Sequence, residues 1–376
     1  MGKSLSLLKD GTHGSYENVQ QGAWLLSAKN IINNRVVITS NDRKISESDF
    51  KKIHDKFQLR KGDVLLTIVG TIGRSAILKE ANKLTFQRSV AYLRPDENIL
   101  TSSNFLFSLS KSSNFQNQLK KRTVISAQPG IYLSDIDKLN ITIPELKEEQ
   151  DKIASIIITI DGILSLQQRK LEILIKLKQS FLTKSMANNL DKNPELYFNS
   201  ASIKWLKQKL SNLTIKEFKG NTKLNDAKPG KTEYLDAKRL NGNAPLFIDK
   251  PINTLKSDIL ILWDGSKAGS VYYGFEGSLG STLKAIRLNP KLVNSFFVYQ
   301  QLKSKQDVIF NKYRTPNIPH VIKNFTKIYP IYFPSMAVQN KIARFLGNLD
   351  TLIEIQQKSI KDYKVIKKYL LQKLFI

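Results

Sequence analysis

The sequence contains no cysteine and only three histidines, His13, His54 and His320, which lie far apart in the chain. Without cysteine, disulfide frameworks, thiolate zinc sites and cysteine nucleophiles are all excluded. The histidines have no pairwise spacing typical of metal ligands, so we expect no metal site on this chain.

Long hydrophobic runs are also missing. The longest, such as 156–158 and 259–263, are far too short to cross a bilayer. The first residues lack the apolar core of a signal peptide. We therefore expect a soluble, intracellular protein with no membrane partner.

Catalytic motifs are equally scarce. Residues 230–232 read Gly-Lys-Thr, as in a phosphate-binding loop, but Asn225 occupies the position of the first glycine that such a loop requires. Neither a Gly-x-Gly-x-x-Gly fingerprint nor the Asn/Asp-Pro-Pro-aromatic run of amino-methyltransferases occurs. These absences predict a chain without a catalytic centre and without a bound cofactor of its own.

Acidic residues are few compared with basic ones. The 376 residues include 59 Lys plus Arg against 32 Asp plus Glu, which gives a net charge of +27. Such an excess indicates a polyanionic partner, and double-stranded DNA is the obvious one. A lysine-rich proteome from an AT-rich genome is the alternative explanation. Hydrophobic residues reach 41%, enough to form the cores of two or three domains.

The positive charge is unevenly distributed. Residues 1–142 carry a net +9 and residues 189–332 a net +12, whereas residues 143–188 carry only +1 and residues 333–376 carry +5. The excess is therefore concentrated in the two segments with irregular, loop-rich sequence, where readout groups are usually displayed.

The chain repeats itself. The 37 residues that start at Gln150 align without a gap with those that start at Gln339, with 10 identities that include Asp161/Asp350, and Pro144 and Pro334 precede the two segments. Upstream, 61–73 resembles 256–269, 89–95 resembles 284–290 and 26–31 resembles 235–240. In chain order we predict a first globular domain over 1–142, a first spacer helix over 143–188, a second globular domain over 189–332, and a second spacer helix over 333–376.

Both spacer helices carry apolar heptads, which favour a coiled coil over simple packing of each helix on its own domain. The predicted seam positions of the first helix are Ile153, Ile157, Ile160, Leu164, Gln167, Leu171 and Leu174. Those of the second helix are Ile342, Leu346, Leu349, Ile353, Gln356, Ile360 and Leu370.

Polar residues interrupt both seams at matching places, Gln167/Gln356 and Lys178/Lys367. Polar seam residues cost stability and determine register. If the helices pair antiparallel, Gln167 and Gln356 should both lie close to the pseudo-twofold axis, because each is near the midpoint of its helix.

Each globular copy reads as an α+β domain. Alternation over 84–92 predicts one half-covered strand, and helices are expected over 105–121 and 294–310. The glycine-rich turns at 70–73 and 265–269 fit two roles equally well, backbone contact with phosphate or a tight connection between strands.

Several motifs together resemble one family, the specificity (S) subunits of type I restriction-modification systems, and the resemblance covers essentially the whole chain. The matching segments are DGTH at 10–13, GDVLLTIVGTIG at 62–73, FQRSVAYLRP at 86–95, IPELKEEQDKIASIIITID at 143–161 and FPSMAVQNKIARFLGNLD at 333–350. The second copy departs from the pattern with DGSKAG in its glycine-rich turn and with Val338 where the first copy has Glu149.

The resemblance implies two target recognition domains, each reading one half of an asymmetric bipartite DNA sequence, held apart by two antiparallel helices. Two modification subunits would dock on this pseudo-symmetric frame and methylate adenine from S-adenosylmethionine, and restriction subunits using ATP and Mg²⁺ could join them in the prokaryotic cytoplasm. The two readers should lie about one DNA turn apart, roughly 34–36 Å.

The DNA-contacting residues can only be nominated, because Arg and Gln make bidentate base contacts while Lys contacts phosphate equally well. The nominees of the first copy are Thr12, His13, Lys29, Asn30, Arg74, Gln87 and Arg88. Those of the second copy are Lys223, Lys238, Arg239, Lys267 and Lys284.

Two alternative functions remain open from the sequence. One is a duplicated DNA-binding or architectural protein that works without a methyltransferase partner. The other is a nuclease or methyltransferase with a degenerate site.

Overall fold

The structure is a computed structural model that describes residues 1–124, 127–186, 205–226, 228–316 and 319–375. It divides into two compact units, unit 1 (Met1–Arg169 with Lys358–Ile376) and unit 2 (Lys170–Gln357). Each unit contains one globular domain and one part of each of two long helices, α5 (Lys147–Ser185) and α10 (Met336–Lys373). The domain boundary predicted between residues 188 and 189 lies outside the described residues.

The first globular domain is built on a four-stranded antiparallel sheet. Its strands, in spatial order, are β1 (Leu5–Asp10), β9 (Val90–Pro95), β6 (Val64–Thr67) and β7 (Ser75–Ile77). The ends of β1 and β6 lie beside the start of β9, because Asp10 pairs with Ala91 and Thr67 with Val90. The loops after β1, after β6 and before β9 therefore gather at one end of this sheet.

Two smaller sheets and several short helices complete this domain. The three-stranded sheet contains β5 (Arg43–Ile45), β2 (Ala23–Leu26) and β8 (Leu84–Phe86), with β2 parallel to β8. The hairpin contains β3 (Ile31–Ile32) and β4 (Arg35–Val36). The helices are η1 (Gly2–Ser4), η2 (Ala28–Asn30), α1 (Glu47–Ile53), α2 (Ser103–Ser110), α3 (Ser113–Arg122) and α4 (Leu133–Asp137).

The second globular domain has the same sheet topology. Its four-stranded antiparallel sheet contains β11 (Thr214–Lys219), β17 (Leu283–Leu288), β14 (Ile259–Leu262) and β15 (Val271–Tyr272). Its three-stranded sheet contains β13 (Phe247–Ile248), β12 (Pro229–Leu235) and β16 (Ser278–Leu279), again with one parallel pair. The remaining elements are β10 (Leu206–Lys209), β18 (Pro330–Phe333), η3 (Leu210–Leu213), η4 (Leu224–Asp226), α6 (Ala237–Leu240), α7 (Ser295–Ser304), α8 (Gln306–Lys312) and α9 (Phe325–Ile328).

Three element predictions need correction. The half-covered strand expected over 84–92 is two strands, β8 and β9, and its residues 84–86 and 90–93 are buried on both faces. The helix expected over 105–121 is α2 and α3, because α2 ends at its C-cap Lys111 and Ser112 caps α3 by accepting a hydrogen bond from the Phe115 amide (3.2 Å). The helix expected over 294–310 is likewise split at Lys305 into α7 and α8.

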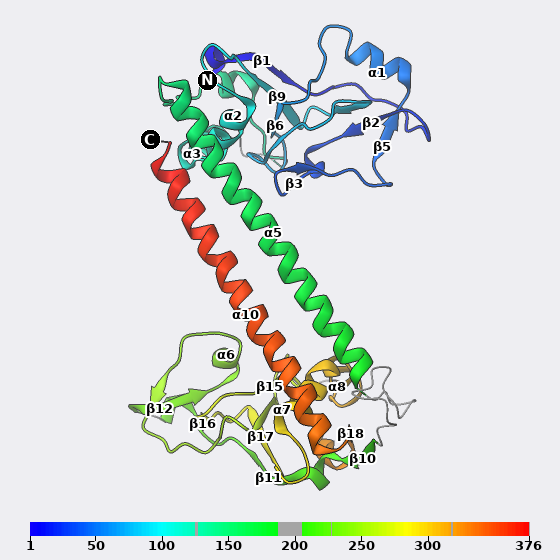
Figure 1. Cartoon of the computed structure of the whole chain (residues 1–376), viewed down its shortest axis with the longest axis vertical. Helices are drawn as coiled ribbons and strands as arrows, with labels where there is room; N and C mark the ends of the chain where they lie inside the picture. Colours follow the sequence, from blue (N-terminus) through cyan, green and yellow to red (C-terminus); the bar gives the residue numbers. More distant parts are fainter. Residues whose placement is uncertain (125–126, 187–204, 227, 317–318, 376) are drawn as a thin grey trace. The chain divides into compact units, whose positions relative to one another are not determined.

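In unit 1 the two long helices run in opposite directions. The last turns of α10, drawn in red in Figure 1, lie beside the first turns of α5, drawn in green. Leu371 and Phe375 of the C-terminal segment share one buried cluster with Ile153 and Ile157 of α5 and with Phe105 of the globular domain. The helices therefore pack both on the domain and on each other.

Unit 2 repeats this arrangement with the opposite ends of the helices. Met186, which follows α5, shares a buried cluster with Ile342 and Leu346 near the start of α10 and with Phe297 of the second domain. Both units thus contain antiparallel helix pairs, and the predicted α+β fold with two tandem domains and an antiparallel coiled coil is confirmed.

The seam positions of the two helices are buried or half-buried without exception. Gln167 belongs to unit 1 and Gln356 to unit 2, so their expected approach at the pseudo-twofold axis stays a prediction. None of the helices, over the ranges described, is long and apolar enough to span a membrane.

Candidate nucleic-acid interface

The loop that follows β1 is joined to the loop between β8 and β9 by backbone hydrogen bonds. The Thr12 amide donates to the carbonyl of Phe86 (2.9 Å), and the Arg88 amide donates to the carbonyl of Thr12 (3.0 Å). The hydroxyls of Thr12 and Tyr16 hydrogen-bond at 2.5 Å. A side chain at Gly11 would place its Cβ 2.2 Å from the Phe86 carbonyl oxygen, so only glycine allows this approach. The two loops therefore form one surface.

Arg88 and His13 line one hollow of this surface, with a volume of about 530 Å³. His13 is exposed, and its Nε2 lies 2.6 Å from Asp10 Oδ2. Exposed Tyr132 lines the same hollow. Among the described residues the Arg88 guanidinium has no hydrogen bond or ion pair. An exposed, unpaired guanidinium at a loop edge is the group that most often reads guanine in the major groove.

Two nominees of the first copy stabilise their own loop. Asn30 is buried, its Oδ1 accepts from the Ser27 amide (3.0 Å) and its Nδ2 donates to the carbonyl of Val37 (2.9 Å). In this conformation Asn30 cannot present its amide to DNA. Lys29 pairs with buried Asp42 at 2.9 Å, and this contact holds the pKa of the Asp42 carboxyl well below its usual range.

Two nominees of the second copy are also engaged within the protein. Lys284 is largely buried, pairs with Glu217, and its ammonium lies 4.0 Å from the centre of the Trp263 ring. Arg239 pairs with Glu233. Because these two cations already have carboxylate partners, we assign them a structural role within the domain in preference to a role in DNA contact.

The remaining basic nominees are exposed and, within the described part of the chain, lack a side-chain partner. They are Arg74, Arg88, Lys223, Lys238 and Lys267. Arg74 lies between β6 and β7, Lys267 lies on the matching turn between β14 and β15, and Lys223 follows β11. In each unit, free cations therefore gather at one end of the main sheet. The structure describes no cluster of three or more His, Asp or Glu residues that could hold a metal ion.

The same loop frame recurs in unit 2 with different side chains. The Thr222 amide donates to the carbonyl of Leu279 (3.3 Å), and the Ser281 amide donates to the carbonyl of Thr222 (3.1 Å). Thr222 therefore takes the place of Thr12, and Gly280 and Ser281 take the places of Gln87 and Arg88. Comparison of the two copies in sequence missed the correspondence of Thr12 with Thr222, because the segment from the end of β11 to Thr222 is one residue longer than the segment from the end of β1 to Thr12. The matched bridges Thr12–Gln87 and Thr222–Gly280 reveal it.

A buried aspartate supports each frame. Asp63 accepts hydrogen bonds from Arg94 Nε (2.7 Å) and Nη2 (2.8 Å). It also accepts from the Arg60 amide (2.8 Å) and so caps the turn before β6. Asp258 accepts from Arg287 Nε (2.8 Å) and Nη2 (2.7 Å) in the same way. This bidentate contact raises the pKa of Arg287. In both copies the aspartate of this structural ion pair lies seven residues before the first glycine of the glycine-rich turn, Gly70 or Gly265.

The glycine-rich turns connect strands tightly. Gly70 (φ +79°) and Gly265 (φ +106°) have left-handed backbones, and their amides donate to the carbonyls of Pro129 (2.8 Å) and Pro319 (2.9 Å). These hydrogen bonds hold each turn as a tight connection between strands, and contact of the remaining turn amides with phosphate stays a prediction. The Gly-Lys-Thr segment lies at the start of strand β12, not in a loop before a helix, which excludes a phosphate loop there.

A repeated glutamine joins each long helix to its domain. Gln150 Oε1 accepts from the Thr101 amide (3.0 Å), and its Nε2 donates to the carbonyl of Pro144 (2.9 Å). Gln339 Oε1 accepts from the Asn294 amide (2.8 Å), and its Nε2 donates to the carbonyl of Pro334 (3.0 Å). Both glutamines are buried. The first residue of each repeated Gln-x-Lys-Ile-Ala segment, at 150–154 and 339–343, is therefore a structural lock between helix and domain.

The seam lysines have carboxylate partners. In unit 1 Lys367 of α10 pairs with Asp161 of α5, and in unit 2 Lys178 of α5 pairs with Asp350 of α10. All four residues are identities between the two copies, but only the structure shows that they pair across the helices. Partly buried pairs of this kind determine the register of a coiled coil.

A second repeated lysine lies near each of these pairs, half-buried Lys111 in unit 1 and the more exposed Lys303 in unit 2, and sequence comparison missed it. Burial lowers the pKa of Lys111 to about 8, helped by the charge of Lys367. Partial desolvation also lowers the pKa of Lys303, which stays exposed, and the charge of Lys178 acts in the same direction. Lys111 donates to the carbonyl of Ser75 (3.3 Å). Aligning the two copies through α2 and α7 would have found both lysines.

The depressed pKa of Lys111 predicts a pH-dependent stability. Below about pH 8 the charged, partly desolvated ammonium lowers the stability of the folded state by about 1–3 kcal/mol. As pH rises from about 8 to 10.5 the folded state loses this proton before the unfolded state does, so the free energy of unfolding should rise relative to a Lys111→Met variant. Urea unfolding of both proteins between pH 7 and 10.5 measures this. A constant difference between them would contradict the assignment.

Comparison with known proteins agrees with this architecture. A family model described as the type I restriction modification DNA specificity domain matches twice, over residues 18–177 and 204–362. The putative type I restriction enzyme MjaX specificity subunit of Methanocaldococcus jannaschii is 25% identical over 373 residues, 89% of this chain and 84% of that protein. The MjaVIII specificity subunit of the same organism is 33% identical over 147 residues, 38% of this chain, and the match spans 34% of that relative's length.

Solved structures share the fold. The S subunit of a type I restriction-modification system from M. genitalium superposes with a TM-score of 0.69 at 20% identity, covering 98% of this chain and 93% of that one. The two matches of the family model together span most of the sequence, and each contains the lock glutamine and most of one globular domain. The chain therefore belongs to the family of type I restriction-modification DNA specificity proteins and contains the family's domain twice.

Proposed function

We propose that this chain is the DNA-reading subunit of a type I restriction-modification enzyme and that it binds an asymmetric, bipartite DNA target. The observation that carries the proposal is the repeated loop frame with different side chains. Gln87 and Arg88 in unit 1 correspond to Gly280 and Ser281 in unit 2. Two equal frames with unequal readout groups suit two different half-sites.

The charge distribution supports DNA as the ligand. The two globular segments carry +9 and +12, and unpaired cations gather at one end of each main sheet. Contacts of such cations with phosphate supply affinity, and contacts with base edges supply sequence preference. Loops of the two globular domains would then read the two half-sites, and the long helices would serve as the spacer between the domains. The complex would act in the prokaryotic cytoplasm.

The long helices offer surfaces for two modification subunits. In unit 1, Leu166 of α5 and Val365 of α10 are exposed, and in unit 2 Ile173 of α5 and Ile355 of α10 are exposed. Apolar side chains in such number along long helices mark protein contacts. The modification subunits would bring S-adenosylmethionine and methylate adenine, restriction subunits would bring ATP and Mg²⁺, and this chain would contribute recognition without catalysis.

Replacement of Arg88 with alanine tests this function. We expect a loss of about 1–3 kcal/mol in binding, confined to the first half-site, because a free guanidinium reads one base pair. Methylome sequencing of a host that expresses the variant with its modification partner should show a relaxed base in that half. Identical targets for parent and variant would contradict the role of Arg88.

Two controls complete this test. Lys267→Ala should lower the salt slope of binding by about 0.9 without changing the target, as a phosphate contact does. Purification of the chain from its host under native conditions distinguishes the proposed function from that of a stand-alone DNA-binding protein. The stand-alone protein would be recovered without a modification subunit and would still bind its DNA sequence.

A further inference from the structure

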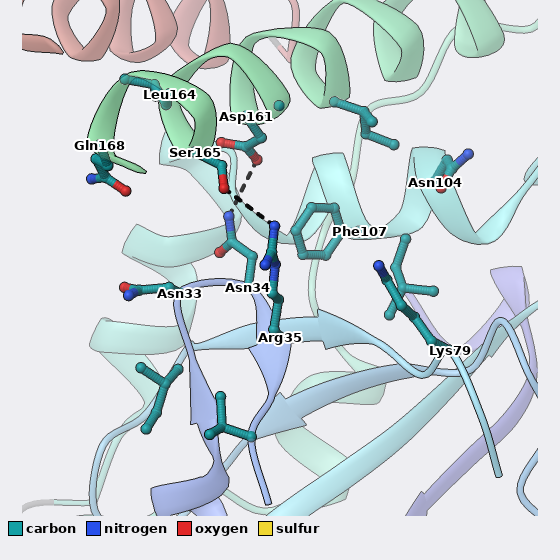
Figure 2. Close-up of a pocket in the computed structure, with 15 residues that line it drawn as sticks. Asn33, Asn34, Arg35, Lys79, Asn104, Phe107, Asp161, Leu164, Ser165 and Gln168 are labelled. Carbon is teal, nitrogen blue, oxygen red and sulfur yellow. Dashed lines mark hydrogen bonds between the residues drawn. The ribbon is translucent and has the colours of Figure 1, made fainter. Parts of the chain in front are cut away.

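The tip of the β3–β4 hairpin reaches from the first globular domain to helix α5 (Figure 2). Asn34 Nδ2 donates to Asp161 Oδ2 at 3.2 Å, and Arg35 Nη2 donates to Ser165 Oγ at 3.2 Å. Asp161 and Ser165 lie four residues apart and so share one face of the helix. The hairpin therefore makes two side-chain hydrogen bonds to a single helix face.

The hairpin turn is a stiff one. Its two central residues, Asn33 (φ +50°) and Asn34 (φ +65°), both have the left-handed backbone of the tightest two-residue turns. Asparagine accepts this conformation more readily than most residues. The turn therefore presents Asn34 and Arg35 in a defined direction.

Between the domain and α5 the packing is open. A hollow of about 720 Å³ lies there, lined by the hairpin, by Phe107 of α2 and by Ile158 and Leu164 of α5 (Figure 2). At this level of the helix, side chains do not fill the space continuously. The residues that make the two hydrogen bonds of the hairpin tip also line this hollow.

The first anchor of the domain on α5 is the buried glutamine lock at Gln150, near the helix start. Asp161 lies 11 residues further along, about 16 Å at 1.5 Å per residue. Ile153 and Ile157 pack against the domain over the two helical turns that follow Gln150. A further anchor at Asp161, beyond these contacts, restricts tilting of the domain about the start of the helix.

Asp161 connects the hairpin to both helices, because it also pairs with Lys367 of α10. Unit 2 braces its domain differently. There Gln300 of α7 donates to Asp350 Oδ2 at 2.7 Å, and Asp350 pairs with Lys178. The described part of unit 2 contains no hairpin that bonds to a long helix. The two domains are thus attached to the long helices by different contacts, a hairpin tip in unit 1 and a glutamine of α7 in unit 2.

We propose that Asn34 and Arg35 form a positioning strut that sets the direction of the first recognition domain on α5, and thereby the number of base pairs accepted between the half-sites. The spacing role rests on the proposed function. The bracing role concerns the chain alone and is tested separately.

A distance measurement tests the bracing. Because the sequence lacks cysteine, spin labels can be placed at exposed Lys51→Cys in α1 and Arg169→Cys in α5. In the full chain, the double variant Asn34→Gly with Arg35→Ala should broaden the label-to-label distance distribution about twofold, as expected when a pivoting population appears. Asn34→Gly keeps the left-handed turn, and the melting curve verifies folding.

The matched control is Asn33→Gly, which alters the same turn at a residue without a hydrogen bond to α5. Its distribution should equal that of the parent. An unchanged width in the double variant, or an equal broadening in the control, would overturn the strut.

DNA spacing is the second readout. With its modification partner, the parent should prefer its own spacer over spacers one base pair longer or shorter, which rotate the half-sites by about 35°. In the double variant this preference should fall about tenfold, with little loss on the parent spacer. A preserved preference would overturn the spacing role. A parent that binds no bipartite DNA would contradict the proposed function, while the label distances would still decide the bracing.

Discussion

Replacing Asp258 with alanine is expected to lower the free energy of unfolding of unit 2 by about 3–5 kcal/mol. The Asp258 side chain is fully buried and accepts two hydrogen bonds from Arg287. Its loss leaves the guanidinium partly buried without a counter-charge and removes the cap on the Leu255 amide (3.0 Å). A loss of this size is a large fraction of the stability of a typical domain.

Hydrogen exchange measures this effect in each unit. Amides of β14 and β17 should lose protection in Asp258→Ala, whereas those of β6 and β9 should keep it, because Asp63 and Arg94 are intact there. Recognition of the second half-site should fail first. Asp264→Ala is the control, since its pair with Lys219 is exposed and worth less than about 1 kcal/mol. Equal losses from both variants would refute the argument.

Gln339→Leu should destabilise unit 2 by about 2–4 kcal/mol. Leucine has a similar size but neither accepts from the Asn294 amide nor donates to the Pro334 carbonyl, and both groups would stay partly or fully buried and unpaired. Denaturant unfolding followed by circular dichroism gives the change.

The neighbouring Asn340 provides a matched control for this prediction. It is exposed and accepts one hydrogen bond from Asn294 Nδ2 (2.8 Å), so Asn340→Ala should cost less than about 1 kcal/mol. Gln150→Leu should reproduce the Gln339→Leu effect in unit 1. If leucine at either position leaves stability unchanged, the lock interpretation fails.

The candidate interface is only partly visible in the sequence. Thr12, His13, Gln87 and Arg88 are separate nominees there, and the structure brings their loops together because antiparallel pairing places the end of β1 beside the start of β9. Asn30 is a nominee because its amide could bind a base, but the side chain is buried in the domain and cannot reach DNA in this conformation. Side-chain type indicates what a residue can bind, and only the fold determines whether it is exposed.

By itself the sequence determined the duplication, the long helices, the location of the positive charge and the family. These follow from local patterns, since heptads and repeated motifs are read along the chain. The tertiary structure alone decided that Lys367 pairs with Asp161, that Asp63 binds Arg94, and that Asn34 at a hairpin tip donates a hydrogen bond to Asp161. Those contacts join residues far apart in sequence, and their energy depends on burial and distance, which no local pattern encodes.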